Sequence, residues 1–188
     1  MSADNLSFRE KVRTYLNGFS WKQATPSKFI AMGLIVLVFL IDQWSKGIIL
    51  EKLSGFVHAK EITPFFDLVL VRNKAVTFGM FGGVTDTLGP WVFIIISLMA
   101  CMALGMYLWR TTSVLIALCC GLIIGGALGN AFDRLFRGGT VVDFLYFHIG
   151  EVSWYVFNLA DTAIVGGVMI WIIYSFFSDK KNTGNFEG

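Results

Sequence analysis

Four long apolar runs dominate the pattern of hydrophobic and polar positions along the chain. They cover Phe29–Leu50, Leu88–Trp109, Ser113–Asn130 and Thr162–Phe177, and the last reaches spanning length if Tyr155–Asp161 forms its first turns. Each run is long enough to cross a hydrocarbon core of about 30 Å as a helix. The runs lack the period-2 alternation of membrane β-barrel strands. The pattern therefore predicts a helical membrane protein with four transmembrane helices.

The segment 51–87, between the first two runs, has a different pattern. Pro64 is followed by a mixture of apolar and β-branched residues, which favours one or two strands. These strands would pair with Gly139–Phe147 and form a small sheet over the helices. The predicted fold class is therefore membrane all-α with a small β element. Five apolar side chains of this segment would either contact lipid or pack the sheet onto the bundle: Phe65, Phe66, Leu68, Phe78 and Phe81.

Composition and charge placement support a membrane protein and predict its orientation. The 188 residues are 55% hydrophobic and only 15% charged, which is unlike a soluble domain of this size. Basic residues precede the first run, occupy the 110–112 turn and follow the fourth run, although the segments 51–87 and 131–155 carry some as well. The positive-inside rule places both termini and that turn in the cytoplasm. It leaves 51–87 and 131–155 outside.

The domain organisation follows from these runs. Residues 1–28 carry too long a charged lead for a cleavable signal peptide, and no A-x-A-like site follows in Phe29–Ile41. They are predicted to be a cytoplasmic segment, either a helix lying on the membrane surface or a partly disordered tail. Residues 29–177 form the four-helix unit, and 178–188 a cytoplasmic tail.

Several kinds of chemistry have no sequence signal. Cys101, Cys119 and Cys120 lie inside apolar runs, where they act as small hydrophobes. His58 and His148 form no zinc-protease motif, and no nucleophile elbow or phosphate-binding glycine loop is present. The sequence therefore predicts no metal, no cofactor and no nucleic-acid partner.

The unusual polar residues gather at one predicted face. They lie in the outer third of the first run, at the end of the third, at the start of the fourth and in the segment between those two: Asp42, Gln43, Lys46, Asn130, Asp133, Arg134, Asp143, Asn158 and Asp161. Polar residues placed for loop solubility alone would occur at both faces. Carboxylates at the hydrocarbon border are costly and usually functional. One-sided clustering therefore predicts a single site near the outer boundary.

Asp143 and Asp161 are the candidate reactive pair of this site. Two carboxylates a few ångströms apart cannot both ionise cheaply, so they titrate as a unit that holds one proton. The ionised member can take a proton from water while the neutral member donates to a scissile carbonyl. Such a pair suits peptide hydrolysis without a metal. Spacing alone leaves an alternative open, in which Asp161 only stabilises the start of a helix.

Four separated motifs carry a resemblance to a known family. They are Asp42-Gln-Trp-Ser-Lys46, Gly129-Asn-Ala-Phe-Asp-Arg134, Val141-Val-Asp-Phe144 and Phe157-Asn-Leu-Ala-Asp161, in this order across the four runs. This pattern, over about residues 29–177, resembles lipoprotein signal peptidase, the type II signal peptidase of bacteria. The family is an aspartic endopeptidase of the bacterial inner membrane. It removes signal peptides from prolipoproteins on the N-terminal side of a diacylglyceryl-modified cysteine.

The resemblance also implies roles for individual residues. The catalytic aspartates of the family match Asp143 and Asp161. Supporting or substrate-binding positions match Asn73, Asn130, Arg134, Asn158, Asp42, Lys46 and Asp133. The implied fold is a four-helix bundle with an outer β-cradle and a mobile periplasmic helix. The implied partners are a lipid-modified prolipoprotein, membrane lipids and globomycin-type inhibitors, with the site at the periplasmic side of the inner membrane.

One motif departs from the family pattern. The family usually has Asn-x-Gly-Ala-Ala-Phe where this chain has Asn73-Lys-Ala-Val-Thr-Phe78. Glycine is used where φ is positive or another chain approaches closely. Ala75, which replaces that glycine, therefore puts the loop geometry, or the fit of substrate near it, in question, and Thr77 replaces a further small residue. Asn73 is retained and could hydrogen-bond a substrate backbone.

The supporting residues also have purely structural interpretations. Asn158 is either a helix N-cap or a substrate-binding amide. For Arg134 an ion pair with Asp42 or Asp133 is favoured, and for Lys46 a side chain that snorkels to the outer headgroups.

The glycines of the predicted helices carry an expectation about packing. Glycines of the third and fourth runs are expected to let helices approach closely: Gly125, Gly126, Gly129, Gly166 and Gly167.

The alternative functions are a small proton- or ion-coupled transporter and a non-enzymatic scaffold. Against transport, the acids lie near one end of the spans rather than at the midplane.

Overall fold

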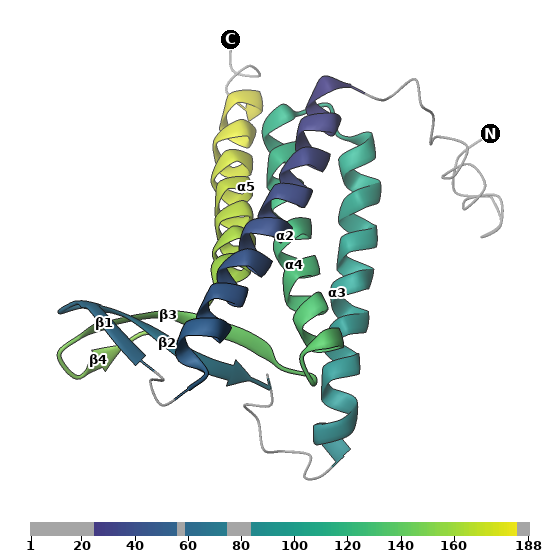
Figure 1. Ribbon diagram of the computed structural model, residues 1–188. Helices are drawn as coiled ribbons and strands as arrows, with labels where there is room; N and C mark the ends of the chain where they lie inside the picture. The colour runs from purple at the N-terminus through teal and green to yellow at the C-terminus, as the bar shows by residue number, and fades with distance from the viewer. Residues whose placement is uncertain (1–24, 56–58, 75–83, 184–188) are drawn as a thin grey trace.

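The computed structural model describes residues 25–55, 59–74 and 84–183. Within them the chain forms helices α2 (Pro26–Leu53), α3 (Val84–Arg110), α4 (Val114–Phe136) and α5 (Leu159–Thr183). These helices form a bundle with a small sheet at one end (Figure 1). All four contain a stretch long and apolar enough to cross a membrane. The prediction of a mostly helical membrane protein with a small β element is therefore confirmed, whereas its orientation stays a prediction.

Helix α4 is the central element because it packs against α2, α3 and α5. In its most apolar window 56% of the residues are buried, against at most 17% in the other three helices. The outward faces of α2, α3 and α5 expose large apolar side chains, as expected of surfaces that meet lipid.

Small residues make this close packing possible. A Cβ built at Gly125 would lie 2.8 Å from Val38 Cβ on α2, and one at Gly129 would lie 2.6 Å from Asp42 Oδ2. Gly126 faces Ala160 on α5, and Gly167 faces α4. The expectation for these glycines is confirmed. It is wrong for Gly166, because nothing lies within 4 Å of a Cβ at that position.

The sheet contains β1 (Ala59–Thr63), β2 (Phe66–Asn73), β3 (Val141–Ile149) and β4 (Val152–Ser153), in that order and antiparallel. Strand β2 pairs with β3 from Phe66 opposite Phe147 to Asn73 opposite Val141. This confirms the predicted pairing of the outer segment with Gly139–Phe147. The left-handed residues Gly138 and Gly139, with φ of 65° and 79°, turn the chain from α4 into β3.

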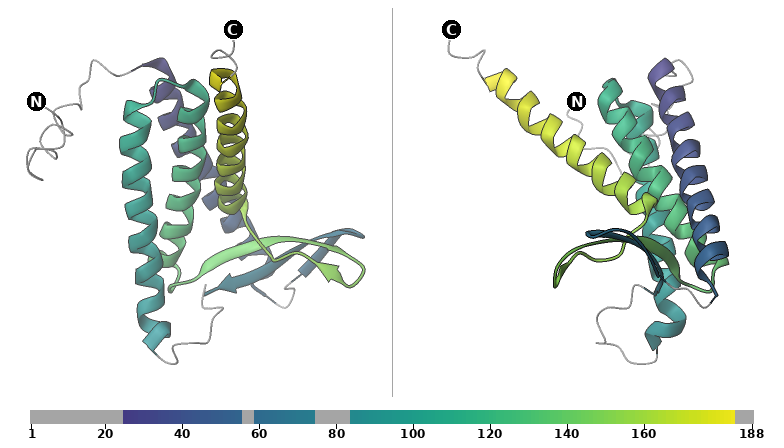
Figure 2. Two further views of the ribbon diagram at one scale, coloured as in Figure 1. Left: turned by 180° about the vertical axis from the view of Figure 1, so that it is seen from behind. Right: turned by 60° about the vertical axis from the view of Figure 1, so that its left-hand side comes forward.

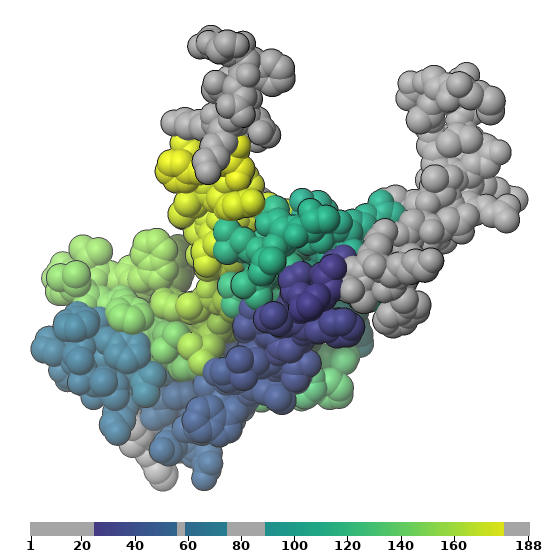
Figure 3. Space-filling view, turned by 90° about the horizontal axis from the view of Figure 1, so that it is seen from above, coloured from purple at the N-terminus to yellow at the C-terminus, as the bar shows by residue number. Residues whose placement is uncertain are grey.

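The sheet crosses the end of the bundle and projects sideways beyond it (Figure 3). Helix α5 starts beside the sheet and slopes away from α2 and α4 toward its C-terminal end (Figure 2). The start of α2 and the end of α5 lie at the end of the bundle opposite the sheet (Figure 1). The sheet, the end of α4 and the start of α5 therefore meet in one place.

The predicted spans agree with the helices, but the helices are longer. Helix α3 begins at Val84, inside the predicted outer segment 51–87, and α5 continues to Thr183, inside the predicted tail 178–188. Helix α4 continues six residues past Asn130 to Phe136, so its polar residues Asp133 and Arg134 are still helical. The predictions for residues 1–24 lie outside the described residues, as do the departures Ala75 and Thr77. The aromatic residues Phe78 and Phe81 also fall outside them.

Candidate active site

Asp143 lies on β3, at the edge where the sheet meets the helices. Its carboxyl is only 2% exposed. Asn73, at the end of the neighbouring strand β2, donates its Nδ2–H to Oδ2 at 2.8 Å. Asn158, just before α5, donates its Nδ2–H to Oδ1 at 2.6 Å. The carboxyl of Asp143 is therefore held by neutral amides from two separate segments.

Asp161 lies in the first turn of α5, and its backbone takes part in a capping box. Its N–H donates to Asn158 Oδ1 at 2.9 Å, while its own Oδ2 accepts the N–H of Asn158 at 3.2 Å. Its other oxygen accepts the Nδ2–H of Asn130, from α4, at 2.7 Å. Asp161 thus stabilises the helix start with one oxygen, and the second oxygen belongs to the polar site.

Asn130 and Asn158 connect the two carboxylates. The Nδ2–H of Asn158 also donates to Asn130 Oδ1 at 3.2 Å, so the two amides form a bridge from Asp143 to Asp161. Burial raises the pKa of Asp143 to about 6; the hydrogen bond from Asn73 opposes this, and the nearby charge of Asp161 adds to it. A carboxyl with a pKa in this range can change its protonation state near neutral pH.

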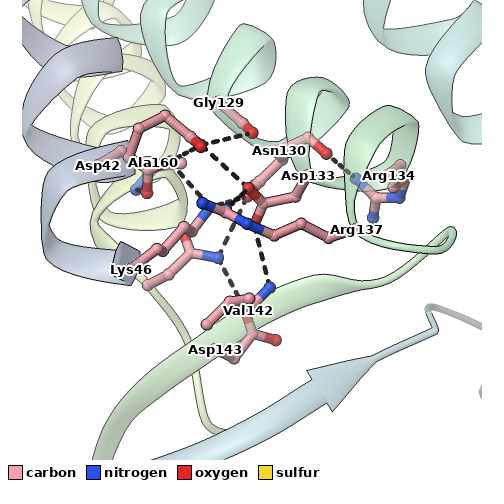
Figure 4. A network of polar contacts seen from close by, with 12 residues as sticks. Asp42, Lys46, Gly129, Asn130, Asp133, Arg134, Arg137, Val142, Asp143 and Ala160 are labelled. Atoms are coloured by element: carbon pink, nitrogen blue, oxygen red, sulfur yellow. Dashed lines mark hydrogen bonds and ion pairs between the residues drawn. The ribbon is translucent and has the colours of Figure 1, made fainter. Parts of the chain in front are cut away.

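A second pair of carboxylates, Asp42 and Asp133, lies near Asp143 (Figure 4). Asp42 on α2 and Asp133 on α4 are fully buried, and Lys46 Nζ lies 2.8 Å from Asp42 Oδ2 and 3.0 Å from Asp133 Oδ2. Arg137 also pairs with Asp133. Gln43 donates to both carboxylates at 3.0 Å. Buried charges are tolerated when they are paired and hydrogen-bonded in this way.

This second pair holds the backbone of the first. Asp133 Oδ2 accepts the N–H of Val142 at 3.0 Å, and Asp42 Oδ1 accepts the N–H of Ala160 at 3.0 Å. Val142 directly precedes Asp143, and Ala160 directly precedes Asp161. Each buried aspartate therefore fixes the residue before one member of the candidate reactive pair.

Two sequence-based expectations are wrong. Lys46 does not snorkel to the headgroups, because it is 0% exposed and contacts Asp42 and Asp133. Arg134 forms no ion pair with Asp42 or Asp133. Its guanidinium instead donates to Asn130 O at 3.2 Å and lies 5.1 Å from the centre of the Phe93 ring. The expectation failed because consecutive helical residues point in different directions.

Arg137 and the bridging role of Gln43 were missed from the sequence. Arg137 is one helical turn beyond Asp133, so their i,i+4 spacing was the available signal. Gln43 is adjacent to Asp42, but its contact with Asp133 spans 90 positions and requires the fold. For Asn158 the structure confirms the N-cap, since its oxygen accepts the N–H of Asp161, while its amide donates to Asp143; binding of substrate by this amide stays a prediction.

The geometry supports acid–base chemistry. Two carboxylates share a network of neutral amides, and Asp161 is partly exposed so that water can reach it. Such a pair can hold one proton between its two members and can both accept and donate one.

Comparison with known proteins points to one family. Residues 34–177 match the family model described as Signal peptidase (SPase) II. The chain is 48% identical over 119 residues to the lipoprotein signal peptidase of Beijerinckia indica, covering 63% of this chain and 70% of the relative. It is 42% identical over 151 residues to that of Methylobacterium radiotolerans, covering 78% and 85%, and 37% identical over 150 residues to that of Aquifex aeolicus, covering 80% and 87%.

Solved structures agree with the sequence comparison. A bacterial membrane enzyme determined by the in meso method at 2.3 Å resolution superposes with a TM-score of 0.66 at 27% identity. The match covers 81% of this chain and 90% of that one. A 1.9 Å structure of the same description gives a TM-score of 0.65 at 27% identity, covering 77% and 91%. These relatives give no support to the transporter interpretation.

Proposed function

The chain belongs to the signal peptidase II family, and on this basis we propose that Asp143 and Asp161 are the catalytic pair with which it works. By family it is an aspartic peptidase that cleaves signal peptides from prolipoproteins. The observation that carries the assignment is the amide bridge of Asn130 and Asn158, which ties both carboxylates into one site.

The proposed reaction is general acid–base hydrolysis by the shared-proton pair. The ionised carboxylate removes a proton from a water molecule, and the oxygen of that water attacks the scissile carbonyl carbon. The protonated carboxyl donates to the carbonyl oxygen. When the tetrahedral intermediate collapses, a proton passes to the leaving amine and the peptide bond breaks. The raised pKa of Asp143 helps the pair keep one proton near neutral pH.

The finer substrate assignment is a prolipoprotein whose cysteine already carries a diacylglyceryl group, cut on the N-terminal side of that cysteine. A wholly apolar cavity of about 360 Å³ between α2, α3 and α4 supports an acyl chain resting against the bundle. Phe39, Leu128 and Phe136 are among its lining residues. A globomycin-type cyclic peptide would occupy the carboxylate pair and inhibit cleavage.

The proposed location is the bacterial inner membrane, with the site at the periplasmic side and both termini cytoplasmic. The site and the sheet lie at one end of the bundle, while the start of α2 and the end of α5 lie at the other (Figure 1). The basic residues Lys28 and Arg110 are at the end away from the site, which supports this orientation.

The deciding experiment replaces each catalytic candidate with its isosteric amide. Asp143→Asn and Asp161→Asn are reconstituted in lipid, and cleavage of a diacylated precursor peptide is followed. Each variant should lose cleavage by more than about 10³-fold, because an amide neither takes up nor releases the required proton. Full cleavage by either variant would contradict the proposal.

A matched control comes from the same sheet. Asp67 lies on β2 and pairs with His148, with a 3.2 Å contact away from the amide bridge. Asp67→Asn should keep cleavage within a few fold of the unmodified enzyme. Thermal unfolding of all three variants separates loss of chemistry from loss of structure. Loss of cleavage in Asp161→Asn with an unchanged Tm would also reject a purely capping role.

A further inference from the structure

Lys46, on α2, contacts three oxygen atoms beside the candidate reactive pair. Its ammonium lies 2.8 Å from Asp42 Oδ2, 3.0 Å from Asp133 Oδ2 and 3.0 Å from Asn130 Oδ1. It is 0% exposed, so these three acceptors form its surroundings rather than water. An ammonium has three donors and no acceptor, and three oxygens satisfy it. Lys46 therefore contacts more acceptors than it would need if it only neutralised one carboxylate.

The contact with Asn130 determines which way that amide faces. An ammonium can only donate, so the oxygen of Asn130 must point at Lys46. The amide nitrogen then points at Asp161 Oδ1, to which it donates at 2.7 Å. With the amide reversed, its nitrogen would meet the ammonium and its oxygen would meet the carboxylate. Both contacts would be repulsive.

The second bridging amide is fixed independently. Asn158 Oδ1 accepts the backbone N–H of Asp161, which is also a pure donor. Its nitrogen must therefore face Asp143 and Asn130. The helix cap orients Asn158, whereas the oxygen of Asn130 accepts from two donors, the ammonium of Lys46 and the Nδ2–H of Asn158. Of these two donors, Lys46 is the cation.

Lys46 also supports the backbone on both sides of the site. It neutralises Asp133, which holds the N–H of Val142, and Asp42, which holds the N–H of Ala160 (Figure 4). Its positive charge lowers the proton affinity of Asp143, opposing the effect of burial. The groups that face the carboxylate pair are thus Asn73 from β2, Asn158 from the α5 cap, Asn130 and Arg134 from α4, and Lys46 from α2.

We propose that Lys46 is a positioning residue for catalysis, which sets the orientation of Asn130 and thereby presents an N–H to Asp161. This rests on the proposed roles of Asp143 and Asp161. Lys46 does not touch the reacting atoms. Its effect passes through Asn130 to the carboxylate, so it should act on kcat and on the pH profile rather than on KM.

The test separates positioning from simple charge balance. Lys46→Met alone leaves Asp42 and Asp133 with Arg137 as the remaining cation among the described contacts, so it should lower both Tm and kcat. Lys46→Met combined with Asp42→Asn removes one charge of each sign, and the Asn oxygen can still accept the N–H of Ala160. The double variant should recover Tm to within a few degrees. Its kcat should stay ten- to a hundredfold low, with KM nearly unchanged.

The pH profile of the double variant supplies a second measurement. Without the ammonium the carboxylate pair binds its proton more tightly, so the profile of kcat against pH should move to higher pH. Recovery of kcat together with Tm, and a profile at the original position, would show that Lys46 only balances charge and would overturn the proposal.

Asn130→Ala tests the same step without touching Lys46, in case the first variants fold poorly. It leaves the ion pairs of Lys46 in place and removes the N–H at Asp161. It should lower kcat by a factor similar to that of the double variant, and combining the two should cost little more. Unchanged kcat in Asn130→Ala, or fully additive losses, would contradict the proposal.

Asp161→Asn, measured in parallel, keeps the two proposals apart. An active Asp161→Asn would remove the catalytic assignment itself. An inactive Asp161→Asn beside a fully active double variant would overturn the role of Lys46 alone.

Discussion

Two pairs of aspartates lie at the same end of the bundle, and they differ in what surrounds them. Asp42 and Asp133 both contact the ammonium of Lys46, and both are fully buried. Asp143 and Asp161 accept hydrogen bonds from neutral amides, and among the described residues neither forms an ion pair. The first pair is matched by full positive charges, as buried carboxylates require. Neutral donors leave the second pair able to bind or release a proton, which is what acid–base chemistry requires.

The two pairs are also connected through hydrogen bonds to the backbone. The buried pair accepts the N–H groups of Val142 and Ala160, the residues that precede Asp143 and Asp161. The two carboxylates of the proposed catalytic pair are costly neighbours, because each disfavours ionisation of the other. The buried pair together with Lys46 and Arg137 forms a charge-balanced platform that holds the backbone next to both of them. The two pairs consist of the same residue type, so the groups that surround each aspartate, rather than the residue type, distinguish their roles.

Exchanging one member of each pair for asparagine gives the largest expected contrast. Asp143→Asn should reduce cleavage by more than about 10³-fold without lowering Tm at neutral pH, because it removes a proton carrier and leaves no buried charge in its place. Asp133→Asn should instead lower Tm while the folded fraction keeps measurable activity. Cleavage kinetics and thermal unfolding in the same detergent measure both. Equal losses of activity in the two variants would remove the distinction between the pairs.

The sequence predicted the four spans, the pairing of β2 with β3 and the clustering of the polar residues, because apolar runs, strand pattern and one-sided charge are local signals. It did not predict the partners of Lys46 and Arg134. Both are long side chains near a membrane border, where snorkelling and ion pairing are equally compatible with the pattern.

The choice between these alternatives depends on the fold. Lys46 is enclosed because Gly129 lets α2 and α4 come close enough to surround its ammonium. Arg134 points elsewhere because it directly follows Asp133 on α4, whereas Arg137, one turn further along, pairs with Asp133. Such distances between helices are not encoded in any single segment of the chain, and the two aspartate pairs could not be told apart from the motifs alone.

Complete removal of a carboxylate from the charge-balanced pair should have the second largest effect. Asp133→Ala leaves Lys46 and Arg137 short of a partner and frees the N–H of Val142. Breaking a buried ion pair on one side typically costs about 3–5 kcal/mol of stability. Equilibrium unfolding in detergent should show this loss. Asp67→Ala serves as the control, because its partner His148 is partly exposed and the loss should be about 1 kcal/mol or less.

The pH dependence of stability should distinguish the pairs next. Burial raises the pKa of Asp143 from 3.8 to about 6, so the folded state binds this proton more tightly than the unfolded state does. The resulting stabilisation is fully present below pH 4 and is lost as the pH rises through about 6. It amounts to about 3 kcal/mol over that window.

The measurement is the difference in Tm between the unmodified protein and Asp143→Asn from pH 4 to pH 7.5. Asparagine does not titrate, and Asn73 can turn its amide to present an oxygen to it. The difference should therefore shift in favour of the asparagine variant as the pH rises. A difference that is flat, or that shifts in the opposite direction, would show that Asp143 does not carry a raised pKa.

The smallest expected effects come from removing one neutral donor from each pair. Asn73→Ala takes a hydrogen bond from Asp143, and Gln43→Ala takes one from each of Asp42 and Asp133. Each lost hydrogen bond should cost about 1.5 kcal/mol of stability, the lower end of the range for a hydrogen bond to a charged group. The two variants should differ in their pH profiles. Asn73 lowers the pKa of Asp143, so its loss makes the reactive pair bind a proton more tightly and moves the profile of kcat to higher pH, by about one pH unit at most. Gln43→Ala acts on carboxylates that pair with Lys46 and make no direct contact with the reactive pair, so its profile should stay in place. A shift of equal size in both variants would mean that the two pairs titrate as one system, and the separation into a reactive pair and a charge-balanced platform would fail.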